Sequence, residues 1–348
     1  MKNRLFFILL AGMVIAFAAG VYYVFFYDVS EKRYNKIMCY YIARDVTDGT
    51  GDFYEKIARL RDFVNENIMP IDFSRLRLDT CAIEKLTTGS GWCDQQARVF
   101  MQLARGIGIT SRLLFLRDGT GSSPHSIAEA LAPDKRWVIV DSAFKLDLRN
   151  KKGDFATRSD VRNDIGIVRD NDRIKLRAKF EEAWGKTGFL SIYSNPPTHV
   201  TCKKVNAIDY LKFVPTDLLR PAVAVINQRY LDRVRPGIEN PFEFKMAKAR
   251  TQHLLGYYGR ASALYDDIIR NSGEPRLIRK AQYFNAVLLK DQDRYSEACD
   301  YITGVLKKDR HDPYGKFLIG LRARILNKTG KPLEADRDLE SVGYDLEV

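Results

Sequence analysis

The sequence is poor in residues that bind metals. It contains 4 histidines and 5 cysteines in 348 residues, and no two cysteines form a Cys-x-x-Cys pair. This sparse set argues against a zinc site, and no motif for a cofactor is present, so we predict no metal and no cofactor. The odd number of cysteines leaves at least one free thiol, although a disulfide between Cys81 and Cys93 stays open.

The sequence also lacks the features of a nucleic-acid-binding protein. The formal net charge is +12, but the basic residues are spread out and no basic run is interleaved with aromatic residues. We therefore predict no nucleic acid as a partner. An ordinary solvated basic surface is the favoured interpretation, and attraction to anionic lipid headgroups or an acidic polymer is the alternative.

Charge is absent from the stretch 5–26, which is otherwise apolar. A helix needs about 20 residues to cross the hydrocarbon core of a bilayer, whereas a cleavable signal has an apolar core of about 7–15 residues. An uncleaved anchor is thus favoured, with cleavage near Ala18–Gly20 as the alternative. The short basic head, Lys2 and Arg4, predicts a single-pass membrane protein whose bulk faces the periplasm or the cell exterior, with the lipid bilayer as a partner.

A cysteine stands at the predicted start of a helix. After the stretch 89–92, Gly-Ser-Gly-Trp, the chain continues with Cys93, and apolar residues then recur at helical spacing until glycines at 106 and 108 end the helix. The apolar face consists of Ala97, Phe100, Met101 and Ala104. The first turn of a helix favours an anion, so this position favours the thiolate form of a cysteine.

A histidine and an aspartate flank a predicted hairpin. His125 precedes an apolar run over 127–131, and Asp141 follows a second run over 136–140 after a Pro-Asp turn. In an antiparallel hairpin the start of one strand lies beside the end of the next, so His125 and Asp141 are predicted to be neighbours. A thiolate nucleophile needs such a base, and the base needs a group that fixes its tautomer.

These residues together resemble the transglutaminase-like superfamily, a papain-like cysteine fold. The resemblance covers roughly residues 50–150 and rests on Gly91-Trp92-Cys93, the Gly-Ile-Thr-Ser-Arg connection at 108–112, His125, and Trp137 to Asp141. It implies that Cys93 is the nucleophile, His125 the general base and then acid, and Asp141 the orienting carboxylate. The chain departs from the family at Ile127, where an aromatic residue is common, and at 142–143, where Ser-Ala replaces Pro-Thr.

The remaining patterns are mostly helical. Helices are predicted over 33–42, over 53–69 with Pro70 at its end, and over 174–184 and 207–214, while 71–92 is a loop and 150–171 a polar surface excursion.

In the C-terminal part, Ala261, Ala298 and Ala335 recur at equal intervals, each near the start of a second helix after a turn. This resembles tetratricopeptide repeats, which are helix–turn–helix units of about 34 residues and usually bind a partner protein. A generic helical bundle is the alternative.

The predicted fold class is α+β, with an N-terminal transmembrane helix, a papain/transglutaminase-like core and a C-terminal α-helical repeat domain. The predicted domains are a membrane anchor (1–28), a transglutaminase-like domain (29–160), a connecting region (161–243) and the repeats (244–348). The resemblance implies a cysteine enzyme that attacks an amide bond of a peptide or similar substrate through a thioester. Hydrolysis, as in a protease or amidase, is ranked ahead of acyl transfer to an amine, because transfer demands a site that excludes water. The alternative is a catalytically inert membrane-tethered scaffold that binds a partner in cell-envelope or surface-polymer assembly.

Overall fold

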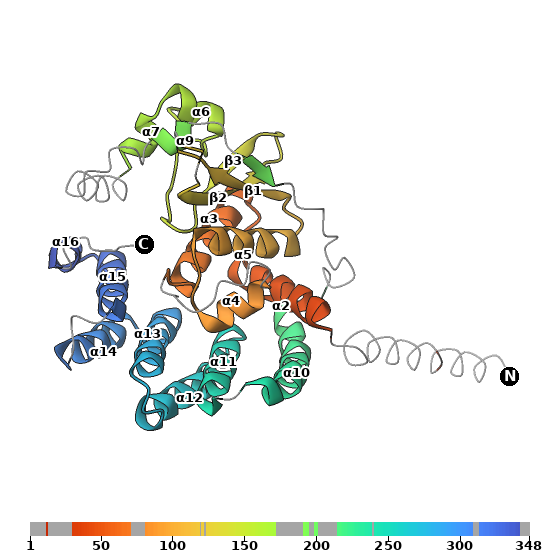
Figure 1. Ribbon diagram of the computed structural model, residues 1–348, viewed down its shortest axis with the longest axis vertical. Coiled ribbons are helices and arrows are strands. Elements are labelled where there is room, and N and C mark those ends of the chain that lie inside the picture. The colour runs from red at the N-terminus through yellow and green to blue at the C-terminus, as the bar shows by residue number, and fades with distance from the viewer. Residues whose placement is uncertain are drawn as a thin grey trace.

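The computed structural model describes residues 12, 30–70, 81–118, 120–121, 123–171, 191–194, 198–200, 214–238, 240–308 and 313–341. Within these residues a small sheet carries helices on both faces, and an arc of helices from the C-terminal half lies against one side of that unit (Figure 1). The elements before the first strand are α2 (Glu31–Val46), α3 (Phe53–Asn67), α4 (Ala82–Thr88) and α5 (Cys93–Gly106).

The helices before the sheet form where local signals agree with an apolar face. The side chain of Asp52 accepts the backbone N–H of Glu55 and so caps α3. Ile57, Leu60 and Val64 are fully buried on one side of that helix. The helix predicted over 53–69 is confirmed as α3, which ends two residues earlier, at Asn67. The helix predicted over 33–42 is confirmed as α2, which is longer at both ends.

Helix α5 is the central helix of this half. All four residues of its predicted apolar face are buried, and it packs against α2, α3 and the sheet. Gly106 permits a close crossing, since a Cβ there would stand 3.2 Å from the backbone of Cys39 and Tyr40 in α2. Gly108, at φ +83°, then turns the chain into the first strand.

Within the described residues the sheet has four strands in the order β3-β2-β1-β4, with every neighbouring pair antiparallel. The strands are β1 (Ser111–Leu116), β2 (His125–Leu131), β3 (Trp137–Val140) and β4 (Thr198–Val200). The predicted hairpin is confirmed as β2 and β3, with Ala128 opposite Val140. Alternate residues face opposite sides, so Ala128 packs toward α5 while Ile127 packs toward the other face.

The second face of the sheet is covered by a segment predicted to be a surface excursion. The chain after β3 forms α6 (Arg158–Asn163) and α7 (Gly166–Arg169), and α9 (Ser191–Ser194) lies beside them. Val161, Val168 and Ile192 are buried against the sheet residues Ile127 and Ile139. The surface prediction was therefore wrong, because widely spaced apolar residues in a polar segment make this second core.

The described residues from 214 onward form helices joined by short connections. These are α10 (Thr216–Val234), the 3-10 turn η3 (Arg235–Gly237), α11 (Pro241–Leu254), α12 (Tyr258–Asn271), α13 (Pro275–Asp291), α14 (Tyr295–Lys308), α15 (Pro313–Lys328) and α16 (Pro332–Ser341). Helix α10 packs on α2, where the rings of Tyr34 and Tyr230 stack at 3.8 Å. The helix predicted over 174–184 falls outside the described residues, as does the one over 207–214 except for its last residue.

The predicted fold class and location require a correction. None of the helices within the described residues combines the length and the apolar character that a membrane crossing needs. The stretch 5–26 lies outside those residues except for Gly12. The described structure thus does not support the predicted transmembrane helix or the single-pass membrane location that followed from it. It is predominantly helical around one small sheet.

The loop from α4 to α5 lies directly against α13. Gly89 adopts φ +65°, and a Cβ at this position would stand 2.2 Å from the ring of Phe284. Gly89→Ala therefore adds a steric clash to the ordinary cost of a left-handed alanine, which is about 1 kcal/mol. Gly108→Ala is the matched control, because Gly108 has φ +83° and a methyl group added there would meet nothing within 4 Å.

We expect Gly89→Ala to lower the free energy of unfolding by about 1–3 kcal/mol more than Gly108→Ala does. Urea denaturation of the two variants measures this difference. Equal losses of unfolding free energy in the two variants would show that the ring of Phe284 moves aside without an energetic cost.

Candidate active site

Cys93 is the first residue of α5 and is partly exposed. The preceding residue, Trp92, has the extended backbone of an N-cap, and its N–H donates to the side-chain carbonyl of Gln95 at 3.0 Å. The first backbone N–H groups of a helix lack partners within the helix and favour a negative charge. The thiol therefore lies at the N-terminal end of α5, where a reagent can reach it.

His125 and Asp141 are in direct contact. The Nε2 of His125 lies 2.8 Å from the Oδ2 of Asp141, and both side chains are almost fully buried. His125 begins β2 and Asp141 follows β3, so the hairpin brings the two residues together as its register requires. The phenyl ring of Phe144 packs 4.5 Å from the imidazole and limits its movement.

The charges of the pair change its titration. Burial disfavours the imidazolium, but the charge and the hydrogen bond of Asp141, followed by those of Cys93, outweigh burial and raise the pKa of His125 to about 9. Burial likewise opposes ionisation of Asp141, but His125 and two further donors hold the pKa of that carboxyl below its usual value. An imidazolium paired with a carboxylate is thus the favoured state near neutral pH.

The structure brings two of the three predicted residues, His125 and Asp141, into direct contact. Nε2 of His125 is directed at Asp141, and a hydrogen bond between the side chains of His125 and Cys93 contributes to the raised pKa. A thiol, an imidazole and a carboxylate in this order can generate a nucleophile and later protonate a leaving group.

Sequence reasoning missed Tyr193. Its hydroxyl, from α9, donates to Oδ2 of Asp141 at 2.7 Å, and its side chain is 1% exposed. The other oxygen of Asp141 accepts the N–H of Phe144 at 3.0 Å. Tyr193 lies 52 residues after Asp141 in a segment without a recognisable motif, so no local signal identified it.

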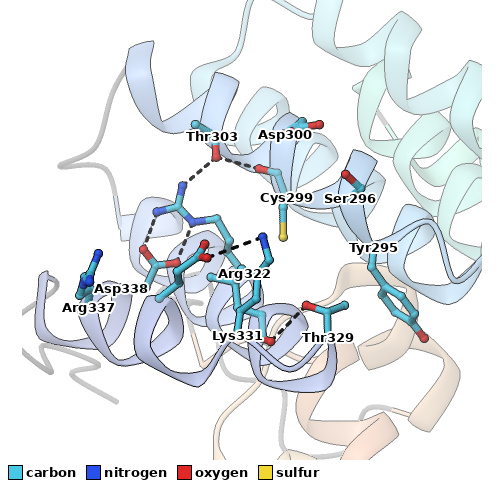
Figure 2. Close-up of a pocket in the computed structure, with 12 residues that line it drawn as sticks. Tyr295, Ser296, Cys299, Asp300, Thr303, Arg322, Thr329, Lys331, Arg337 and Asp338 are labelled. Carbon is cyan, nitrogen blue, oxygen red and sulfur yellow. Dashed lines mark hydrogen bonds and ion pairs between the residues drawn. The ribbon is translucent and has the colours of Figure 1, made fainter.

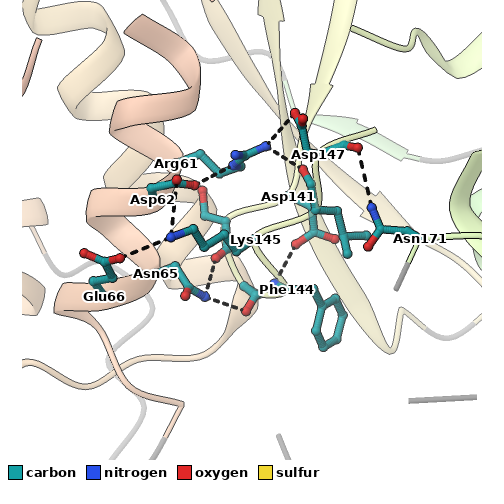
Figure 3. Close-up of polar contacts among 12 residues, drawn as sticks. Arg61, Asp62, Asn65, Glu66, Asp141, Phe144, Lys145, Asp147 and Asn171 are labelled. Atoms are coloured by element: carbon teal, nitrogen blue, oxygen red, sulfur yellow. Dashed lines mark hydrogen bonds and ion pairs between the residues drawn. The ribbon is translucent and has the colours of Figure 1, made fainter. Parts of the chain in front are cut away.

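The turn that follows Asp141 is fastened to α3, as Figure 3 shows. The amide of Asn65 donates to the carbonyls of Ser142 and Ala143 at 2.9 Å, and Arg61 donates to the carbonyl of Leu146 at 2.8 Å. Lys145 pairs with Asp62 and Glu66 at 3.3 and 3.1 Å. The polar face of α3 thereby fixes the backbone that carries the orienting carboxylate.

The remaining cysteines and acidic residues were considered as parts of a disulfide or a metal site. The four cysteines within the described residues are free thiols, so the disulfide that stayed open between Cys81 and Cys93 is not formed. Within the same residues, Glu31, Cys81 and Glu84 lie close enough to share an ion. Exposed acidic groups also gather without an ion, and nothing else marks this cluster as a metal site.

A separate pocket of about 550 Å³ lies among the last helices (Figure 2). Its lining comes from α14, α15 and α16 and their connection, and includes none of the three candidate residues. Arg322 crosses it, paired through two nitrogens with Asp338 at 2.6 and 2.7 Å. This internal pairing neutralises much of the charge that a ligand would meet.

Comparison with known protein families finds a match within the first half of the chain. The model of the transglutaminase-like superfamily matches residues 40–142. Residues 40–142 are therefore similar to a transglutaminase-like domain. The match fits a cysteine hydrolase or acyltransferase in general terms.

Two further comparisons add less. A crystal structure of a protein from Cytophaga hutchinsonii, provisionally described as a cysteine protease, matches at 22% identity over 35% of this chain and 42% of that chain, with a TM-score of 0.26. The chain thus spans less than half of that protein, and a likeness at this level supports no conclusion. No curated protein matches the chain.

The raised pKa of His125 predicts how the stability of the protein depends on pH. A group whose pKa is raised on folding contributes stability that is fully present below its unfolded pKa, near 6.5, and is lost as pH rises through about 9. Asp141→Asn removes the carboxylate that contributes most to the raised pKa. The stability difference between wild type and Asp141→Asn should be larger at pH 6 than at pH 10, by on the order of 1–3 kcal/mol.

Urea denaturation at both pH values measures this difference. Asp147→Asn is the control, because that carboxyl is half exposed and its lowered pKa places its titration below this range. A difference for Asp141→Asn that does not change with pH would contradict the ion pair.

Proposed function

We propose that this protein is a cysteine hydrolase that cleaves an amide bond of a peptide or similar substrate. The observation that carries the proposal is the buried contact between His125 and Asp141 beside a thiol at the start of α5. Cys93 is the proposed nucleophile, His125 the proton carrier, and Asp141 the group that orients the imidazole. Their roles are those that the resemblance to transglutaminase-like enzymes implied.

The proposed reaction has two steps. In the first, the Cys93 thiolate attacks the carbonyl carbon, and the oxygen of the tetrahedral intermediate takes the negative charge, facing the N–H of Cys93. The imidazolium of His125 protonates the leaving amine, the C–N bond breaks, and a thioester remains. In the second step, neutral His125 takes a proton from water, the hydroxide attacks the thioester, and the acid leaves as the thiolate re-forms.

Hydrolysis is proposed ahead of transfer to an amine. Transfer requires that the thioester meet an amine in preference to water, which demands a site that excludes water. Partial exposure of Cys93 does not favour such exclusion. An acyltransferase therefore remains the second outcome that an experiment must distinguish.

We further infer that α11 to α16 are tetratricopeptide-like repeats that bind a protein partner. The three alanines that recur in the sequence have no exposed area, and each lies in the first turn of α12, α14 or α16. Small residues there let paired helices approach closely. This assignment rests on the pattern of helices. It is tested by a pull-down experiment, in which Ala298→Leu should abolish the capture of a partner protein.

The chemistry predicts that Cys93 is unusually reactive. Burial raises the pKa of Cys81 to about 11 and also raises that of Cys299, so these two thiols serve as internal controls. Iodoacetamide at pH 7 should alkylate Cys93 at least about tenfold faster than either of them. His125→Ala should remove most of that difference, because the thiolate loses its imidazolium.

Peptide mapping by mass spectrometry measures the three rates in one sample. If Cys93 reacts no faster than glutathione, the proposed enzyme is excluded and an inert scaffold is favoured. For the reaction itself, peptides in ¹⁸O-water with a labelled primary amine separate the outcomes: ¹⁸O in a new carboxylate reports hydrolysis, and label reports transfer. Cys93→Ala must abolish either signal.

A further inference from the structure

The loop that leads to Cys93 is held by a lysine from α13. Nζ of Lys280 donates to the carbonyl of Thr88 at 2.8 Å and to the hydroxyl of Ser90 at 3.0 Å. Lys280 is 7% exposed, so its ammonium is held at these oxygens with little access to water. Hydrogen bonds from a buried charged donor are strong and directional. The loop is therefore fixed in position rather than merely covered.

An aromatic ring and a buried arginine support the same loop. The ring of Phe284, one turn after Lys280, fills the space beside Gly89. Arg250 of α11 lies over that ring at 3.6 Å and donates through Nε to the carbonyl of Leu86 at 3.1 Å. The end of α4 and the following loop thus rest on the C-terminal helices.

This loop sets the beginning of α5. On its other side, Met69 accepts from Gly91 at 2.9 Å and donates to Gly89 at 3.0 Å. Residues 89–91 are consequently clamped between the end of α3 and α13. Because Trp92 and Cys93 follow at once, a displacement of this loop moves the sulfur and the backbone N–H of Cys93 together.

The other end of α13 reaches the turn after Asp141. Lys290 donates to one oxygen of Glu66 at 2.6 Å, and the other oxygen of Glu66 contacts Lys145 at 3.1 Å. Burial opposes ionisation of Glu66, but Lys290 and Lys145 outweigh it and hold the pKa of that carboxyl well below its usual range. Lys145 has φ +53°, a backbone that a non-glycine residue adopts only when neighbours stabilise it.

We propose that α13 is a positioning element of the active site, which aligns the nucleophile through Lys280 and the orienting carboxylate through Lys290, Glu66 and Lys145. This inference rests on the proposed function, since it concerns the same three reacting groups. Because α13 contacts both the loop before Cys93 and Glu66, it fixes the distance between these two arms of the site. The C-terminal helices are then part of the catalytic unit, and a partner bound to them can alter the reactivity of Cys93.

The test uses the full chain and the alkylation rate of Cys93. Lys280→Met and Lys290→Met keep the length of the side chain and remove its charge. Lys245→Met is the matched control, because Lys245 of α11 pairs with Asp267 of α12 and contacts neither arm. We expect each of the first two variants to slow alkylation at pH 7 by about tenfold or more, and the control to leave it unchanged.

Two further measurements separate positioning from loss of fold. Ser90→Ala and Lys280→Met should be non-additive in a double-mutant cycle, since both remove the same contact. Hydrogen exchange of the peptide over 89–96 should accelerate in Lys280→Met and not in Lys245→Met. Lys280→Arg, which retains the donors, should recover at least part of the rate if Lys280→Met proves unstable.

The outcomes distinguish this inference from the proposed function. If wild-type Cys93 is no more reactive than glutathione, both are overturned. If wild-type Cys93 is reactive while Lys280→Met and Lys290→Met react at the wild-type rate, α13 does not position the site and the proposed function stands. Additive effects in the cycle would likewise overturn the role of Lys280.

Discussion

The structure of the first half depends on burying the contact between His125 and Asp141. A carboxylate inside a protein is costly unless its oxygens are paired, and here both oxygens are satisfied. One accepts from the imidazole and from Tyr193, and the other accepts the N–H of Phe144. The cover on the second face of the sheet contributes to this pairing: α9 supplies the hydroxyl of Tyr193, and the buried apolar residues around it limit the access of water to the pair.

The same contact explains the polar face of α3. Asp141 ends a strand, and the chain must turn sharply enough for its own carboxylate to accept from Phe144. That turn places Lys145 at a positive φ, which is unfavourable for lysine. Asn65 and Arg61 bind the carbonyls of the turn, and Glu66 binds its lysine, so α3 compensates for the strain with directional contacts. A helix that merely buried Leu60 and Val64 would not need these residues.

Local patterns predicted the parts of the site that lie within single elements. The apolar spacing behind Cys93 and the turn between β2 and β3 were sufficient to place the thiol at a helix start and His125 beside Asp141. Tyr193 and Lys280 could not be predicted in this way, because each binds atoms of a segment that is far away in the sequence. The second core of the sheet was also missed, since its apolar residues are dispersed in a polar stretch. The transmembrane prediction relied on an apolar run outside the described residues, and the described helices do not support it.

The interface between the two halves is unusual in its use of cations. Arg250 and Lys280 are buried there, and across it their donors bind the carbonyls of Leu86 and Thr88, the amide of Asn67 and the hydroxyl of Ser90. Apolar side chains of similar volume would often stabilise such an interface as well or better, because burying a charge has a large desolvation cost. Apolar contacts, however, allow two packed elements to slide against each other, whereas donors directed at particular oxygens hold the elements in one relative position. An interface built from buried donors at the loop before Cys93 therefore favours a fixed geometry over maximal stability, which is the requirement of a reacting centre.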